Sequence, residues 1–114
     1  MDIRVRRTEN VTIVELAGSL DISNVHQVRP VVVDATSTEC AQIAINLRDL
    51  YFVDSSGLAV LVQGWKRARA HHGNLCLYSV QPPVRMILEL TRFDKVFEIF
   101  VREEDAVLAA TSRY

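Results

Sequence analysis

Two adjacent hydroxyls follow a carboxylate in the segment Phe52-Val53-Asp54-Ser55-Ser56-Gly57-Leu58. The segment lies between a stretch with the pattern of a buried strand and a stretch with the pattern of an amphipathic helix. The start of a helix has unpaired backbone N–H groups and the positive end of the helix dipole, so it favours a phosphate. A serine at this position has three candidate roles, namely phosphorylation switch, nucleophile or helix cap.

The elements on either side of this segment have clear patterns. Residues 42–47 alternate, with Ile43, Ile45 and Leu47 on one side, which predicts a strand with one face more buried than the other. A loop from Asp49 to Ser55 is expected next, followed by a helix over about 56–72. The core-facing stripe of this helix is predicted to consist of Leu58, Leu61, Val62, Trp65 and Ala68, which recur with helical spacing. Gly73 is expected to end the helix as its C′ residue.

The rest of the chain predicts an α/β domain. Strands are expected at 3–7, 11–17, 75–80 and 96–101, with Glu9-Asn10 turning the first two into an antiparallel hairpin and Gly18-Ser19 ending the second. Helices are expected from Ser23 or Asn24 to about Ser37, from Pro82-Pro83 to about Leu90, and from Glu103 to Ala110. The order β-β-α-β-α-β-α-β-α predicts one domain over residues 1–114, with a mixed sheet of four to five strands and about four helices. The serines then follow the carboxyl end of a strand, where open α/β sheets place their sites.

Composition and charge argue against several classes of function. The chain has 114 residues, of which 49% are hydrophobic and 24% charged, and its net charge is −1. This balance is typical of a globular domain and creates no overall field that favours nucleic acid or an anionic membrane. One basic cluster consists of Arg4, Arg6 and Arg7. A second (Lys66, Arg67, Arg69, His71 and His72) lies late in the long predicted helix, where positive charge complements the dipole.

The cysteines and the N-terminus indicate the cellular compartment in which the protein is expected. Cys40 and Cys76 have no metal-ligand spacing, so two buried free thiols in a reducing compartment are expected. The first seven residues contain no apolar signal-peptide core, and no apolar run approaches the roughly 18 residues of a membrane span. These features predict a cytoplasmic location.

An enzymatic role for the serines finds no support in the sequence. A serine nucleophile needs a base and an orienting acid. His26, His71 and His72 are available, but no spacing implies their contact with Ser56, and there is no Gly-x-Ser-x-Gly elbow. The chain also lacks Walker-type and Gly-x-Gly-x-x-Gly loops, so kinase or dehydrogenase chemistry of its own is not expected.

Several motifs, in this order and spacing, resemble the STAS domain, and specifically the anti-sigma-factor antagonists of bacterial partner-switching systems. The resemblance covers nearly the whole chain. Its motifs are Asp54-Ser55-Ser56-Gly57-Leu58, Gly18-Ser19-Leu20-Asp21, Ile45-Asn46-Leu47 leading into Leu50-Tyr51-Phe52-Val53-Asp54, Val80-Gln81-Pro82-Pro83-Val84, and Phe93-Asp94-Lys95-Val96-Phe97.

The resemblance implies a phosphorylation switch. The family's phosphorylated residue matches Ser56, the hydroxyl before the glycine, and the partner is an anti-sigma factor that is itself an ATP-dependent serine kinase. The unphosphorylated chain would bind this kinase and release a sigma factor, and a PP2C-type phosphatase would reset the switch. No cofactor, direct nucleic-acid contact or membrane contact is expected, since the kinase uses the ATP. The partner-binding surface would consist of Asp21, Ser23, Asp54, Ser55, Ser56, Gly57, Leu58, Val60, Gln63, Gly64 and Arg67.

Two departures from the family pattern concern the partner surface. Pro30 falls inside the first predicted helix, where it removes an N–H and should kink or break the helix. Arg92 replaces the usual glycine after the third helix, and an arginine in the left-handed region costs roughly 1 kcal/mol.

Alternatives remain open at several positions. Ser55 or Ser56 is a simple N-cap in one interpretation, and Asp21 is a turn or cap residue near Ser23. Asp54 either fixes the loop or orients a serine hydroxyl. Gly57 and Gly64 each weaken a helix, which suggests close approach of another backbone, although turn opening and packing on a strand are equally good explanations. The alternative function is a phosphorylation-independent STAS subunit of a transport or sensory assembly.

Overall fold

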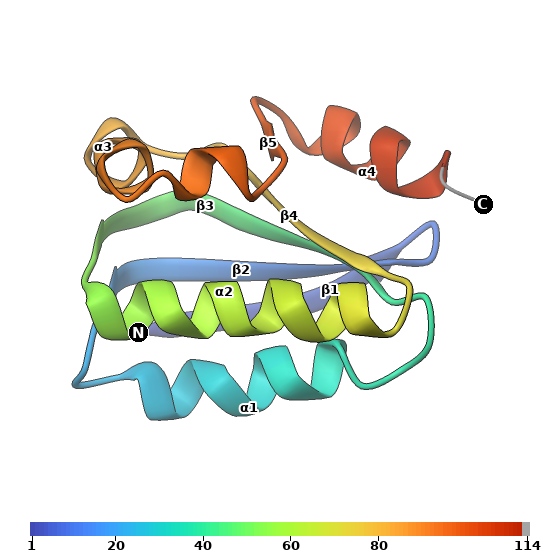
Figure 1. Ribbon diagram of the computed structural model, residues 1–114, viewed down its shortest axis with the longest axis horizontal. Helices are drawn as coiled ribbons and strands as arrows, with labels where there is room; N and C mark the ends of the chain where they lie inside the picture. Colours follow the sequence, from blue (N-terminus) through green and yellow to red (C-terminus); the bar gives the residue numbers. More distant parts are fainter. Residues whose placement is uncertain (113–114) are drawn as a thin grey trace.

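The computed structural model describes residues 1–112, in which five strands form one sheet in the order β1-β2-β3-β4-β5 (Figure 1). The strands are β1 (Asp2–Thr8), β2 (Val11–Leu20), β3 (Gln42–Val53), β4 (Asn74–Tyr78) and β5 (Ile99–Phe100). β1 and β2 are antiparallel, and every other neighbouring pair is parallel. The predicted mixed sheet and order of elements are therefore confirmed.

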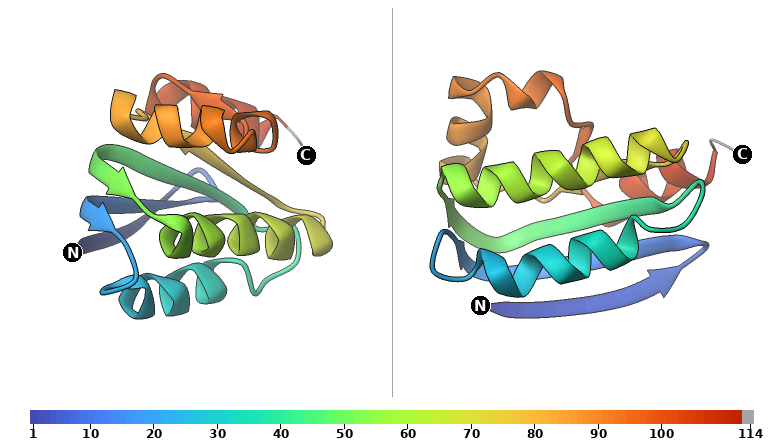
Figure 2. Two further views of the ribbon diagram at one scale, coloured as in Figure 1. Left: turned by 60° about the vertical axis from the view of Figure 1, so that its left-hand side comes forward. Right: turned by 60° about the horizontal axis from the view of Figure 1, so that its bottom comes forward.

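Helices cover both faces of this sheet. They are α1 (Val25–Ala35), α2 (Ser55–Ala70), α3 (Pro82–Leu90) and α4 (Glu103–Thr111), with a 3₁₀ turn η1 (Phe93–Lys95). α1 and α2 lie side by side along the sheet, and α4 lies on the other side of the strands (Figures 1 and 2). Within residues 1–112 no helix is both long and apolar enough to cross a bilayer.

Strand alternation divides the core between the two faces. Ile43 and Ile45 of β3 belong to the larger cluster that includes α1 and α2, whereas Ala44 belongs to a smaller cluster under α4. This division follows from the two-residue period of a strand. The predicted helical stripe is also confirmed: Leu58, Leu61 and Ala68 are buried, and Val62 and Trp65 pack against the core while partly exposed.

The structure corrects the bounds of several strands. β5 spans only Ile99–Phe100 instead of the expected 96–101. β2 does not end at Gly18-Ser19, and residues 49–53 form the end of β3 rather than a loop. The ladder continues through Gly18↔Leu50 after one shift of register and through Leu20↔Val53 after a second shift between Gly18 and Ser19. Gly18 makes this continuation possible, since its φ of +110° is readily adopted only by glycine.

The end of α2 also differs from the prediction. The left-handed residue is His72 (φ 66°), not Gly73. The Gly73 N–H donates to the Ala68 carbonyl at 2.7 Å and the His72 N–H to the Arg69 carbonyl at 3.1 Å, which is a Schellman motif. A Cβ on Gly73 would lie 2.0 Å from the Ala41 oxygen, so glycine is needed there for the close approach of another segment.

The two departures from the family pattern are accommodated differently. Pro30 does not break the first helix, because α1 continues to Ala35 with the proline on its exposed side. Arg92 adopts the left-handed region, with φ 66° and ψ 11°, so the turn between α3 and η1 keeps its shape without glycine.

Both cysteines are free thiols, but only Cys76 is buried. Cys40 is partly exposed in the turn before β3, so the prediction of two buried thiols is wrong for Cys40.

Candidate functional site

The two serines form the first turn of α2, at the carboxyl end of β3 and next to the loop between β2 and α1 (Figure 1). α2 begins at Ser55, one residue earlier than predicted. The Ser55 side chain is exposed and that of Ser56 is partly exposed. Within residues 1–112 neither hydroxyl takes part in a hydrogen bond, so both remain available for modification.

Asp54 caps this helix and ties it to the neighbouring loop. One carboxylate oxygen accepts the Gly57 N–H at 2.9 Å, and the other accepts the Ile22 N–H at 3.0 Å. The Asp54 N–H in turn donates to the Leu20 carbonyl at 3.2 Å. The interpretation of Ser55 or Ser56 as the N-cap is therefore wrong, and Asp54 is the residue that fixes the loop.

A second carboxylate organises the loop itself. Asp21 accepts hydrogen bonds from the Ser23 hydroxyl at 2.5 Å, the Ser23 N–H at 3.0 Å and the Ser19 hydroxyl at 3.1 Å. These bonds, chiefly that from the Ser23 hydroxyl, lower the pKa of Asp21. The Asp21 side chain is thus ionised at neutral pH and held in place beside the start of α1. Its interpretation as a turn residue near Ser23 is confirmed, which leaves its contact with a partner as a prediction.

The expected cap of α1 is also different. Asn24 occupies the N-cap position, but neither its side chain nor that of Ser23 caps the first turn. The Asn24 amide instead donates to the Ser19 carbonyl and accepts the Asp21 N–H. The Asp21 carbonyl accepts the Val25 N–H at 3.0 Å. The side chains therefore hold the loop rather than the helix.

Both glycines of α2 are explained by contacts within the chain. A Cβ on Gly57 would lie 2.5 Å from the Leu20 carbonyl oxygen, so the backbone of β2 approaches this turn closely. A Cβ on Gly64 would lie 2.4 Å from a methyl group of Val32 on α1. Gly57 is thus a site of close backbone approach, as one interpretation expected, but the approaching backbone is the chain's own.

The predicted partner-binding residues fall into two groups. The exposed or partly exposed ones are Asp21, Ser23, Asp54, Ser55, Ser56, Gln63 and Arg67, whereas Gly57, Leu58, Val60 and Gly64 are buried. The buried four shape the surface but offer little side chain to a partner. Sequence reasoning missed Ile22, which is 72% exposed and held by Asp54, because no sequence signal distinguishes an exposed isoleucine from a core one.

His71 and His72 lie away from the serines. His71 and His72 are at the opposite end of α2, about 24 Å from Ser55 at 1.5 Å per residue, and both contact Glu39. Among the described residues no histidine is hydrogen-bonded to either serine, and no three His, Cys, Asp or Glu side chains are placed to bind a metal.

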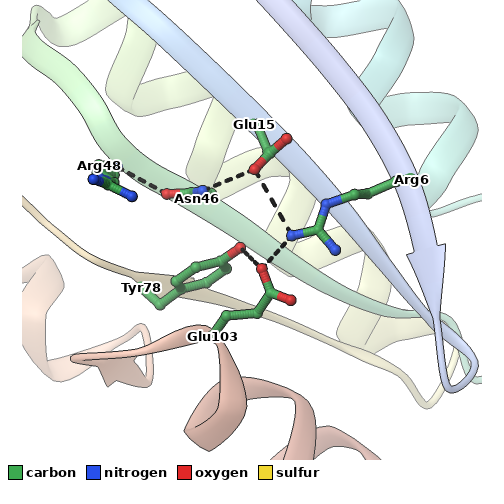
Figure 3. Close-up of polar contacts among 6 residues, drawn as sticks. All are labelled: Arg6, Glu15, Asn46, Arg48, Tyr78 and Glu103. Carbon is green, nitrogen blue, oxygen red and sulfur yellow. Dashed lines mark hydrogen bonds and ion pairs between the residues drawn. The ribbon is translucent and has the colours of Figure 1, made fainter.

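A separate polar network crosses the sheet beneath α4 (Figure 3). Glu103 accepts hydrogen bonds from the Arg6 guanidinium and from the Tyr78 hydroxyl, the latter at 3.0 Å. The bond from Arg6 lowers the pKa of Glu103, while burial and the bond to Glu103 raise the pKa of Tyr78. Glu15 lies 3.8 Å from Arg6 and accepts from Asn46 at 3.0 Å. This network fastens α4 to the sheet and has its polar groups paired.

Comparison with known proteins agrees with this geometry. Residues 2–106 match the STAS domain family. The chain is 31% identical to the anti-sigma F factor antagonist of Paenibacillus polymyxa over 108 residues, covering 94% of this chain and 92% of that protein. The structure of an anti-sigma-factor antagonist (STAS) domain protein from Planctomyces limnophilus superimposes with a TM-score of 0.88, at 29% identity and with 96% and 98% of the two chains covered.

The fold alone is shared with SpoIIAA, a Bacillus cell fate determinant, in its phosphorylated form. The TM-score is 0.71 at 24% identity, with 93% of this chain and 96% of that chain covered. The match over residues 2–106, together with the sheet order and the helix-start serines, shows that the chain belongs to the STAS domain family.

Proposed function

We propose that this chain is an anti-sigma-factor antagonist that is switched by phosphorylation at the start of α2. Unphosphorylated, it binds an anti-sigma factor that is a serine kinase, and a sigma factor is released. The kinase, using ATP, then phosphorylates the chain and ends the complex, and a PP2C-type phosphatase restores it. The observation that carries this proposal is the pair of unbonded hydroxyls at a helix start beside an ordered, exposed loop.

The electrostatics of the site explain how one phosphate would act. A phosphate brings about −1.5 to −2 charges at neutral pH. It is stabilised at the helix N-terminus by about 1 kcal/mol, so the fold survives. The same charge lies beside the carboxylate of Asp54, and its desolvation under a docked partner costs several kcal/mol. Each 1.4 kcal/mol lowers the affinity for the partner tenfold, so the partner dissociates while the domain stays folded.

The two hydroxyls differ in accessibility. The resemblance selects Ser56 as the acceptor. The Ser55 side chain is exposed and that of Ser56 is partly exposed, so both can be reached by a kinase. We propose Ser56 as the acceptor, with Ser55 as the neighbouring hydroxyl.

The experiment incubates the chain with a candidate anti-sigma kinase and ATP, and maps phosphate by mass spectrometry. We expect Ser56→Ala to abolish phosphorylation and Ser55→Ala to retain it. The reverse pattern would assign Ser55 instead, and phosphate on neither serine would remove the switch. In calorimetry, Ser55→Asp and Ser56→Asp should weaken kinase binding about tenfold or more. Ser37→Asp, an exposed serine after α1, is the matched control and should bind like the wild type.

A further inference from the structure

The outer edge of β1 takes no part in the switch. β1 is the end strand of the sheet and, in the described part of the chain, pairs only with β2, so its other edge is free (Figure 2). Edge strands are commonly protected by shortness, proline, a bulge, a covering element or charge. The opposite edge strand, β5, has only two residues. β1 has seven residues, no proline and no shift of register with β2, and its residues 4–7 are exposed, so its protection is charge alone.

The turn that follows β1 determines which backbone groups lie on the free edge. Glu9 and Asn10 both have positive φ, 49° and 66°, as in the two-residue turns that close antiparallel hairpins. In such a hairpin the residues that flank the turn, here Thr8 and Val11, exchange both backbone hydrogen bonds, and bonded pairs recur at every second residue. The residues between these pairs direct their N–H and C=O groups away from β2. They are Ile3, Val5 and Arg7.

The side chains along this edge carry positive charge that the domain itself does not pair. Glu15 is opposite Arg4 on β2, but its carboxylate accepts from Asn46 and lies 3.8 Å from Arg6 instead. Arg4 is exposed and, among residues 1–112, makes no ion pair or side-chain hydrogen bond. Arg7, on the other face, is exposed and contacts no carboxylate in the same part of the chain. The edge therefore presents one unpaired arginine on each face.

A second copy of this chain does not complement the edge. Antiparallel pairing of the whole of β1 with itself would place Val5 opposite Val5 and Arg4 opposite the Arg6 of the copy. Like charges directly opposite each other destabilise a sheet, whereas opposite charges stabilise it. An extended segment with acidic side chains at these positions replaces the repulsion by attraction. Opposite Val5, which is 54% exposed, an apolar side chain fits best.

We propose that the free edge of β1 binds an extended acidic segment of a partner protein as an added antiparallel strand. The backbone groups of Ile3, Val5 and Arg7 form the hydrogen bonds, and the side chains of Arg4 and Arg7 select acidic residues. The segment has the pattern acidic-x-apolar-acidic, read from the residue opposite Arg7 to the residue opposite Arg4. This contact goes beyond the proposed function, because it uses the edge of the sheet and requires neither serine.

The test titrates the full chain with a capped peptide, Glu-Thr-Val-Glu-Val, and follows the amides by NMR spectroscopy. The amides of Ile3, Val5 and Arg7 should shift and exchange more slowly. The expected Kd is millimolar, because a short free strand loses much conformational entropy on binding. Lys-Thr-Val-Lys-Val is the charge control and should bind roughly three- to tenfold more weakly at low salt. The first peptide with its central valine N-methylated keeps the side chains but loses a strand hydrogen bond, so it should not bind.

A variant of the chain tests the charge selection from the other side. Arg4→Glu should abolish the preference for the glutamate peptide over the lysine peptide, because it replaces an attraction by a repulsion. Lys66→Glu is the matched control and should leave both affinities unchanged. Lys66 is also exposed and, within residues 1–112, unpaired, but it lies on α2.

Several results would overturn the proposal. If several millimolar glutamate peptide shifts no amide of β1, the edge does not accept a strand. Equal affinities for the two peptides would remove the selection of acidic residues, and equal binding of the N-methylated peptide would remove strand pairing. If the wild type alone sediments as a dimer with its β1 amides already protected, the occupant is a second copy. None of these results affects the switch, which is tested separately with the anti-sigma kinase.

Discussion

Polar side chains gather at two places in this domain, at the start of α2 and across the sheet beneath α4. In both, carboxylates accept several hydrogen bonds and hold separate segments together. Asp54 joins α2 to the loop after β2, and Glu103 joins α4 to β1 and β4. Their bonding patterns are thus similar, but their surroundings differ.

The difference lies in what remains unpaired. Beneath α4, Arg6 and Tyr78 both donate to Glu103, so the polar groups of the three side chains are paired in a structural network. At the start of α2, the carboxylate is fully used while the hydroxyls of Ser55 and Ser56 stay unbonded within the described residues. A site that a partner binds or modifies must keep polar groups such as these hydroxyls available. This requirement distinguishes the start of α2 from the network beneath α4 better than charge or burial does.

The largest expected effect of a substitution at the α2 start concerns Gly57. Gly57→Ala would place a methyl group 2.5 Å from the Leu20 carbonyl oxygen, a backbone atom that cannot move aside easily. We expect a loss of about 2 kcal/mol in the free energy of unfolding, measured by urea denaturation, despite the better helix propensity of alanine.

Gly18→Ala provides the contrast for Gly57. Nothing lies within 4 Å of an added Cβ there, and only the φ of +110° opposes it. Its cost should be about 1 kcal/mol from backbone strain. If the Gly57 variant is as stable as the wild type, close backbone approach does not define this turn.

The next prediction concerns the two hydrogen bonds that the Asp54 carboxylate accepts. Asp54→Ala removes both acceptors and should destabilise the domain by about 1 to 2 kcal/mol. Amide hydrogen exchange at Ile22 and Gly57 should accelerate together, because one carboxylate holds both N–H groups. Asp54→Asn keeps a single acceptor oxygen and should accelerate only one of the two amides. If amide exchange at Ile22 is unchanged in Asp54→Ala, Asp54 does not link the loop to the helix.

Periodicity predicted the fold well and strand ends poorly. The apolar stripe of α2 is a local pattern, and Leu58, Leu61 and Ala68 are buried as expected. The end of β3 depends on pairing with β2 beyond a bulge at Gly18, which is a contact between distant residues. Exposed Tyr51 and Phe52 also interrupt the alternation there, so the local signal was that of a loop.

The candidate site was predicted in position but not in its internal roles. A one-residue difference in the start of α2 transfers the cap from a serine to Asp54 and frees both hydroxyls. The helix glycines signalled close approach correctly, but only the packing of β2 against the helix shows that Leu20 is the neighbour of Gly57.

The smallest effect tests the network beneath α4 and concerns pH. The pKa of Glu103 is lowered in the folded protein, chiefly by the bond from Arg6, so its stabilising contribution is present above the unfolded value near 4.5. This contribution is lost as the pH falls through the lower, folded value. Glu103→Gln should therefore lower the free energy of unfolding by about 1 kcal/mol at pH 7. As the pH falls, the free energy of unfolding of this variant should decrease less steeply than that of the wild type. Glu104→Gln is the control, because Glu104 is exposed and within residues 1–112 pairs only with Arg102 at the surface, at 3.5 Å. Parallel acid profiles for the wild type and Glu103→Gln would show that Glu103 does not hold α4, and would remove the contrast between a closed network and an open site.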